Sequence, residues 1–278
     1  MVSNATIFAM LISILVCFVF PIGLAVSFKN KQRGIIGPLM VGFLSFVIFQ
    51  MYIRIPILQY VLPGFEWYIN MSVAGKILFL GITAGLFETF GRWASIKLLL
   101  SKRLSYNTGI LHGIGHGGIE AIIFVGINFI AYLTFASKIN QMGLDAFILT
   151  FIDSGELAVT QITTIGNSLI NEPSWTFLIV GYQRVLTMII HIGFSLLVMQ
   201  GFVNNKVLRY SIIAFLLHAT LDCGAVALKE VGVGVLWIEG YVTLFALAMA
   251  VYVFKSKPMF GSKIAAKIEN QKYIDSNY

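Results

Sequence analysis

The stretch Leu111–Glu120 reads LHGIGHGGIE and lies inside a segment that is otherwise apolar enough to cross a bilayer. His112, His116 and Glu120 follow at intervals of four residues, so on a helix they form one polar stripe. Ionisable groups at membrane depth are costly and rare, and they usually mark function. The four glycines of the stretch let another helix, or a substrate backbone, come close.

The composition fits a membrane protein. Of the 278 residues, 58% are hydrophobic and only 11% are charged, whereas soluble domains contain about 25% charged residues. The net charge of +7 comes from loops and the C-terminal tail, where lipid contact and insertion topology explain it, so we expect no nucleic-acid partner. Cys17 and Cys223 both lie in apolar segments and are interpreted as small hydrophobic residues. The sequence therefore predicts an all-α, polytopic transmembrane helical bundle.

Seven segments are long enough to span, since a bilayer needs about 20 apolar residues. A transmembrane domain over residues 1–254 and a basic cytoplasmic tail over residues 255–278 are expected. Residues 56–70 are aromatic, contain two prolines and are interpreted as an interfacial loop. The expected spans cover about residues 5–28, 35–53, 71–100, 105–136, 174–203, 207–228 and 233–254.

Residues 142–171 are apolar in places but contain several acidic and amide side chains. We interpret this segment as an amphipathic or re-entrant helix, and an eighth span is the alternative. With seven spans, the basic loops all fall on one side of the membrane and the acidic region 138–173 falls on the other. Short basic loops stay cytoplasmic, which predicts an N-terminus outside and a C-terminus in the cytoplasm.

Four expected spans carry polar residues to a similar depth. Glu88 and Arg92 are four residues apart, and so are His218 and Asp222. Arg184 and His191 are seven apart and share a helix face. At about 1.5 Å per residue from the inner helix ends, Glu88 and the histidines 116, 191 and 218 lie roughly 14–21 Å deep in a core about 30 Å thick. The sequence predicts that these four side chains share one layer.

Such a layer has two chemical uses. Glu88 can act as a general base on a water held by the histidines. Alternatively, the histidines and a carboxylate can bind a divalent metal such as zinc, which makes the bound water acidic. Both routes lead to hydrolysis. Arg92 can pair with a carboxylate or stabilise an oxyanion.

Plainer interpretations stand beside these. His112 is the expected bystander among the histidines, and Arg184 can be a snorkelling residue at the outer edge. Gln50 and Arg54, a polar pair four residues apart, either support the site or serve the structure alone. The Glu88–Arg92 pair can be a helix-stabilising ion pair.

At these residues the sequence resembles the YhfC-type intramembrane protease family. The resemblance rests on FETFGR at residues 87–92, GHGGIE at residues 115–120, His191, and HATLD at residues 218–222. That family is distantly similar to type II CAAX prenyl endopeptidases, bacterial CPBP proteins and PrsW-like proteases. The wider group is described by Glu-Glu-x-x-x-Arg, a His motif on the next helix, and a final His-x-x-x-Asn/Asp.

The resemblance implies roles for single residues. Glu88 takes the place of the glutamate that activates water, and Arg92 that of the motif arginine. His116 and His218 match the histidines that hold water or metal. As metal ligands, Asp222 matches the terminal Asn/Asp, and His191 and Glu120 are candidates peculiar to this subgroup. The chain departs from the group at Phe87, which stands where the first glutamate of the pair is expected.

The resemblance favours an intramembrane endopeptidase that cuts a membrane-embedded peptide or protein. It leaves open whether the enzyme uses a metal or is of the glutamic type with no metal. A transporter or channel for protons, metal ions or a small solute is the alternative, because intramembrane His and Glu also form proton relays. A non-catalytic immunity or scaffold protein is a further alternative.

Overall fold

The computed structural model describes residues 1–32 and 34–275, and for residues 261–275 it describes the backbone alone. All regular secondary structure in these residues is helical. Among them, seven helices are long and apolar enough to cross a membrane, which confirms the predicted all-α polytopic bundle. The spans are Asn4–Ser27, Ile36–Gly64, Val73–Leu100, Tyr106–Met142, Ser174–Val203, Val207–Glu230 and Val235–Phe260.

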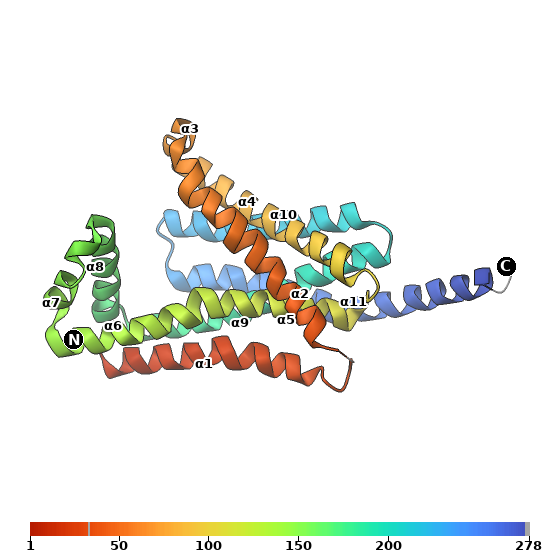
Figure 1. Cartoon of the computed structure of the whole chain (residues 1–278), viewed down its shortest axis with the longest axis horizontal. Coiled ribbons are helices and arrows are strands. Elements are labelled where there is room, and N and C mark those ends of the chain that lie inside the picture. Colours follow the sequence, from red (N-terminus) through yellow and green to blue (C-terminus); the bar gives the residue numbers. More distant parts are fainter. Residues whose placement is uncertain (33, 276–278) are drawn as a thin grey trace. The chain divides into compact units, whose positions relative to one another are not determined.

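The α-helices are labelled in Figure 1, and the second, third and fourth spans also contain π-helical stretches. The α-helices are α1 (Asn4–Ser27), α2 (Ile36–Phe46), α3 (Glu66–Ile69), α4 (Val73–Ser95), α5 (Tyr106–Ala121), α6 (Asn128–Met142), α7 (Leu144–Leu149), α8 (Glu156–Asn171), α9 (Ser174–Val203), α10 (Val207–Glu230) and α11 (Val235–Asp275). The π-helical stretches are η1 (Val47–Arg54), η2 (Ile57–Val61), η4 (Ile96–Leu100) and η5 (Ile122–Ile127). The division into a transmembrane domain over residues 1–254 and a tail over residues 255–278 stays a prediction. The helix α11 passes through residue 254 without a break.

The expected loop over residues 56–70 is wrong. The helical path continues through Pro56 into η2 and the short 3-10 helix Leu62–Gly64 (η3); the extended residue Phe65 then separates it from α3. A proline in an α-helix removes one hydrogen bond and its ring clashes with the preceding turn. Here Pro56 lies between two π-helical stretches, whose wider turns accommodate the ring. The second span is therefore longer than the sequence indicated.

The segment 142–171 folds as two short helices, α7 and α8, joined by a 3-10 turn at Ile152–Ser154 (η6). Neither is among the spans, which supports the amphipathic interpretation over an eighth span. Gly143 and Gly155 start the two helices with φ of +86° and +91°, a left-handed conformation that favours glycine. Phe147 and Leu169 are buried, while the acidic residues of the segment are exposed.

The chain divides into two compact units. The first contains Met1–Ile22 and Glu120–Val185. Its apolar core is contributed by α1, the end of α5, η5, α6, α7, α8 and the start of α9. The backbone N–H of Val2 donates to Asn140 at 2.7 Å, and the Asn140 amide donates back to the carbonyl of Val2 at 3.0 Å. These bonds tie the start of α1 to the end of α6.

The second unit contains Gly23–Ile119 and the chain from Leu186 onward. Within it α4 and α10 lie side by side in opposite directions (Figure 1). Small residues set their close contact, because a Cβ at Gly81 would overlap Cys223 and a Cβ at Gly85 would meet Ala219. Every residue of α9 from 190 to 200 is buried. All four histidines belong to this unit.

The glycines of the Leu111–Glu120 stretch allow the close approach that the sequence predicted. A Cβ at Gly113 would overlap the backbone of Ile192 on α9. A Cβ at Gly115 would overlap the carbonyl of Leu39 on α2. Since these contacts involve rigid backbone, α5 packs between α2 and α9 only while both positions remain glycine.

Candidate active site

The carboxylate of Glu88 is the centre of a buried polar cluster. Its Oε2 accepts a hydrogen bond from Nε2 of His116 at 3.0 Å and one from Arg92 at 3.3 Å. Nε2 of His218 lies 3.7 Å from the same oxygen, and Nδ1 of His191 lies 3.9 Å from it. Glu88 is 5% exposed. One carboxylate oxygen is thus surrounded by three imidazoles and a guanidinium.

Four helices of one compact unit supply these side chains. Glu88 and Arg92 are one turn apart on α4 and share its inner face. His116 comes from α5, His191 from the buried part of α9, and His218 from α10. The structure therefore brings together the four side chains that the sequence placed in one layer, although their catalytic role stays a prediction.

Arg92 links Glu88 to His191. It donates to Oε2 of Glu88 and to Nδ1 of His191. Arginine has no acceptor atom, so Nδ1 of His191 accepts and the ring carries its proton on Nε2. Both Arg92 and Glu88 are buried, and each compensates the charge of the other inside the bundle.

Two phenylalanines hold the imidazoles. The ring of Phe46 meets His116 edge-on, with centroids 5.3 Å apart. The ring of Phe194 stacks on His218 at 5.0 Å and also lies 5.8 Å from the guanidinium carbon of Arg92. Sequence reasoning missed both. Phe194 follows His191 by three residues on the same helix, which was an available signal, whereas nothing in the sequence pointed to Phe46.

Asp222 forms the least buried edge of the cluster. Its Oδ2 lies 3.4 Å from Nε2 of His218, one turn earlier on α10, and its side chain is 31% exposed. Nδ1 of His218 is buried and has no hydrogen-bond partner among the described residues. His218 thus lies between the Glu88 carboxylate and a more accessible acid, with one ring nitrogen available to a further ligand.

His112 is not a partner of Glu88. Its Nε2 lies 3.1 Å from Oγ of Ser95 on α4, and its Nδ1 lies 3.0 Å from Oγ of Ser195 on α9. Both ring nitrogens are therefore engaged by hydroxyl groups, and the buried ring links three helices. Sequence reasoning identified neither serine, although Ser95 follows Arg92 by three residues.

Gln50 and Arg54 lie buried on η1. The guanidinium of Arg54 donates to the carbonyl of Leu80 at 2.7 Å and to Oγ1 of Thr83 at 3.2 Å, both on α4. Oε1 of Gln50 has no hydrogen-bond partner among the described residues. Arg54 thus fixes η1 against the helix that carries Glu88.

Glu120 and Arg184 pair within the first unit. Arg184 donates to Oε1 of Glu120 at 3.0 Å and to Oε1 of Gln183 at 2.6 Å. The side chains of Arg184 and Glu120 are only 12% and 13% exposed, so the interpretation of Arg184 as a snorkelling residue is wrong. Its hydrogen bonds to Gln183 and Glu120 hold the Arg184 side chain inside the unit. Glu120 follows His116 by one turn of α5.

The donor set is compatible with a divalent metal. One ligand atom from each of Glu88, His116 and His191 lies within 4.8 Å of the others. Imidazole nitrogens and carboxylate oxygens are the ligands of catalytic zinc sites. The unpartnered Nδ1 of His218 is a further nitrogen in the same cluster. The residues present therefore fit a metal site.

Seven spans and this buried cluster define a polytopic membrane protein with an ionisable site inside a helical bundle. The sequence model of the family described as "YhfC intramembrane metalloprotease" matches residues 15–243, so the chain belongs to that family. This confirms the resemblance found in the motifs.

The chain is similar to a curated protein of Bacillus subtilis (strain 168), described as "Uncharacterized membrane protein YhfC". The two are 28% identical over 268 residues, which cover 94% of this chain and 100% of that protein. No solved structure matches the chain significantly.

Proposed function

We propose that this protein is an intramembrane endopeptidase that hydrolyses a peptide bond at the Glu88 cluster. The observation that carries the proposal is the convergence of His116, His191 and His218 on one carboxylate oxygen of Glu88, inside a membrane-spanning bundle. The description of the family as intramembrane metalloproteases supports it.

In this proposal Glu88 is the general base. It removes a proton from a water as the water oxygen bonds to the carbonyl carbon of the substrate. The proton then passes to the leaving amine as the C–N bond breaks, which leaves a carboxylic acid and an amine. His116 and His218 position the water. Arg92 keeps the Glu88 carboxylate oriented and stabilises the oxyanion that forms on the carbonyl.

For a metal-dependent form, we propose His116, His191 and His218 as ligands, with Asp222 and Glu120 as further candidates and Glu88 still acting as the base. In that form Nδ1 of His191 would bind the metal in place of Arg92. The alternative is a glutamic-type form, in which Glu88 acts as the base and no metal is bound. A bound zinc ion would lower the pKa of its water and polarise the carbonyl of the substrate.

The proposed substrate is a membrane-embedded peptide or protein, because the cluster lies within the spans. We also propose the bacterial cytoplasmic membrane as its location, with the N-terminus outside and the C-terminus in the cytoplasm. The placement of the basic loops on one side supports this orientation.

Reconstitution separates this proposal from its alternatives. Proteoliposomes would contain the purified protein, a quenched fluorescent membrane peptide and an internal pH-sensitive dye. Wild-type protein is expected to cleave the peptide, which raises its fluorescence, without discharging a proton gradient. Mass spectrometry should find two peptide fragments. Proton or metal flux without cleavage would contradict the protease and favour a transporter. Absence of both would favour a scaffold.

A further inference from the structure

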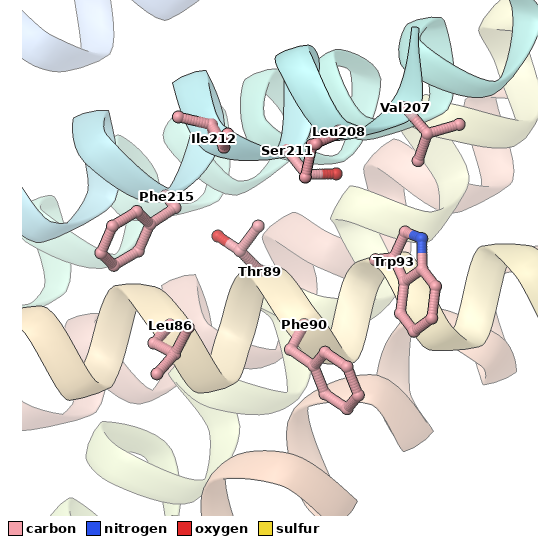
Figure 2. A pocket seen from close by; sticks show the side chains of 9 residues that line it. All are labelled: Leu86, Thr89, Phe90, Trp93, Val207, Leu208, Ser211, Ile212 and Phe215. Carbon is pink, nitrogen blue, oxygen red and sulfur yellow. The ribbon is translucent and has the colours of Figure 1, made fainter. Parts of the chain in front are cut away.

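A groove runs along the inner half of the α4–α10 pair. It has a volume of about 460 Å³ and is walled almost entirely by apolar side chains (Figure 2). Leu86 and Phe90 on α4 and Leu208 on α10 are half or more exposed, so the groove opens on the side of the helices that lipid would cover. The lining residues are Leu86, Thr89, Phe90, Trp93, Val207, Leu208, Ser211, Ile212 and Phe215.

Two hydroxyl groups interrupt the apolar wall. Thr89 is only 5% exposed, and neither its Oγ1 nor the buried Oγ of Ser211 has a hydrogen-bond partner among the described residues. Hydroxyls in membrane helices commonly donate to the carbonyl four residues earlier, as Thr134 does to Ile130. Thr89 and Ser211 instead present their hydrogen-bonding capacity between the two helices (Figure 2).

Residues that line the groove lie next to residues of the Glu88 cluster along both helices. Thr89 follows Glu88 directly on α4. On α10, Ser211, Phe215 and His218 are spaced by four and three residues and therefore share one face. A molecule that lies along this face of α10 from the inner end reaches His218 one turn beyond Phe215.

We propose that this groove binds an extended, apolar peptide segment, with Thr89 and Ser211 bonded to its backbone, and delivers the next peptide bond to Glu88. This inference rests on the proposed function and assigns its substrate subsite. From Leu86 to Trp93 the groove is about 10 Å long, which suits about three extended residues.

The hydroxyls favour a peptide over a lipid chain. At membrane depth an extended backbone has N–H and C=O groups that require partners. Thr89 and Ser211 supply them, while the apolar wall accommodates the side chains. An acyl chain would cover the wall but leave both buried hydroxyls without partners.

Photo-crosslinking tests the subsite without requiring cleavage. Benzoylphenylalanine would replace Ile212 in the groove or, as a control, the lipid-exposed Leu244 on α11, each in the full-length Glu88→Gln protein in proteoliposomes. The probe is a fluorescent peptide of about 20 leucine and alanine residues with a central Gly-Pro that loosens its helix. The adduct is expected at position 212 and not at position 244.

Removing the hydroxyls tests their part in binding. The Thr89→Val/Ser211→Ala double variant is expected to reduce the adduct about three- to tenfold. The matched Thr134→Val variant, whose hydroxyl already bonds to backbone, should leave it unchanged. Thermal unfolding in detergent confirms that each variant is folded, and Ser211→Trp, which fills the groove, should abolish the adduct.

Three results would overturn the proposal: equal labelling at both positions, no effect of the double variant, or displacement of the peptide by palmitic acid. The last would make the groove a lipid site. If the peptide crosslinks at position 212 but wild-type protein cleaves no peptide, the proposed function fails. If wild-type protein cleaves the peptide but labelling is not localised, the groove proposal alone fails.

Discussion

The guanidinium of Arg92 donates a hydrogen bond to Nδ1 of His191, a residue 99 positions later in the chain. Because arginine can only donate, this bond fixes which nitrogen of His191 carries the proton. Arg92 also donates to Glu88, so a single buried cation links the carboxylate of α4 to an imidazole of α9. The geometry of the cluster depends on this link.

Replacing Arg92 therefore separates charge from geometry. Arg92→Lys keeps the positive charge, but its shorter side chain does not place a donor where Nη2 of Arg92 bonds both Glu88 and His191. We expect a folded protein whose rate of peptide cleavage is reduced about tenfold or more. Arg92→Ala leaves Glu88 buried without its cation and should lower the free energy of unfolding by about 3 kcal/mol.

The control is Arg209→Lys, at an exposed position of α10. It should change neither the cleavage rate nor the thermal unfolding midpoint. Cleavage by Arg92→Lys at the wild-type rate would show that the paired hydrogen bonds are not needed.

His112 should contribute to stability rather than to catalysis. His112→Ala removes the imidazole that bonds the hydroxyls of Ser95 and Ser195 and should lower the free energy of unfolding by about 2 kcal/mol. Cleavage per folded molecule should remain close to wild type, whereas His116→Ala should abolish it. A stable His112→Ala protein without activity would place His112 in the reaction.

The glycines on α5 are expected to be intolerant of even a methyl group. Gly115→Ala introduces a Cβ into the carbonyl of Leu39, which should destabilise the protein or prevent folding. The matched change Gly240→Ala, on α11, meets no atom within 4 Å and should be neutral or raise stability by about 0.5–1 kcal/mol. Equal thermal unfolding midpoints for the two variants would contradict the packing of α5 against α2.

Glu120 can be tested as an ion-pair partner and as a metal ligand at once. Glu120→Gln and Arg184→Gln should each cost about 2 kcal/mol, because each leaves one charge largely buried, and the double variant should recover part of that loss. Metal content, measured by mass spectrometry on purified protein, distinguishes the roles. If Glu120 is a ligand, the metal content falls in Glu120→Gln but not in Arg184→Gln.

Hydropathy and residue spacing predicted the seven spans, and the shared depth of Glu88 and three histidines predicted their meeting. Partners supplied by distant helices were not predictable in this way. Ser195 lies 83 residues from His112, and only the packing of α5 on α9 brings them together.

The Arg184–Glu120 pair was missed for a similar reason, because depth along a helix does not indicate which way a side chain turns. The loop expected at residues 56–70 failed differently. A proline normally ends a helix. The helix that contains Pro56 continues, because π-helical turns lie on both sides of this residue.

The central claim is tested most directly by the rate at which the Glu88→Gln protein cleaves a membrane peptide in proteoliposomes. Glutamine preserves the size of the side chain and one acceptor oxygen, but its amide cannot accept the proton of water. We predict a folded protein whose cleavage rate is at least about 100-fold below that of wild type. Cleavage at the wild-type rate by a protein of unchanged thermal stability would contradict the account.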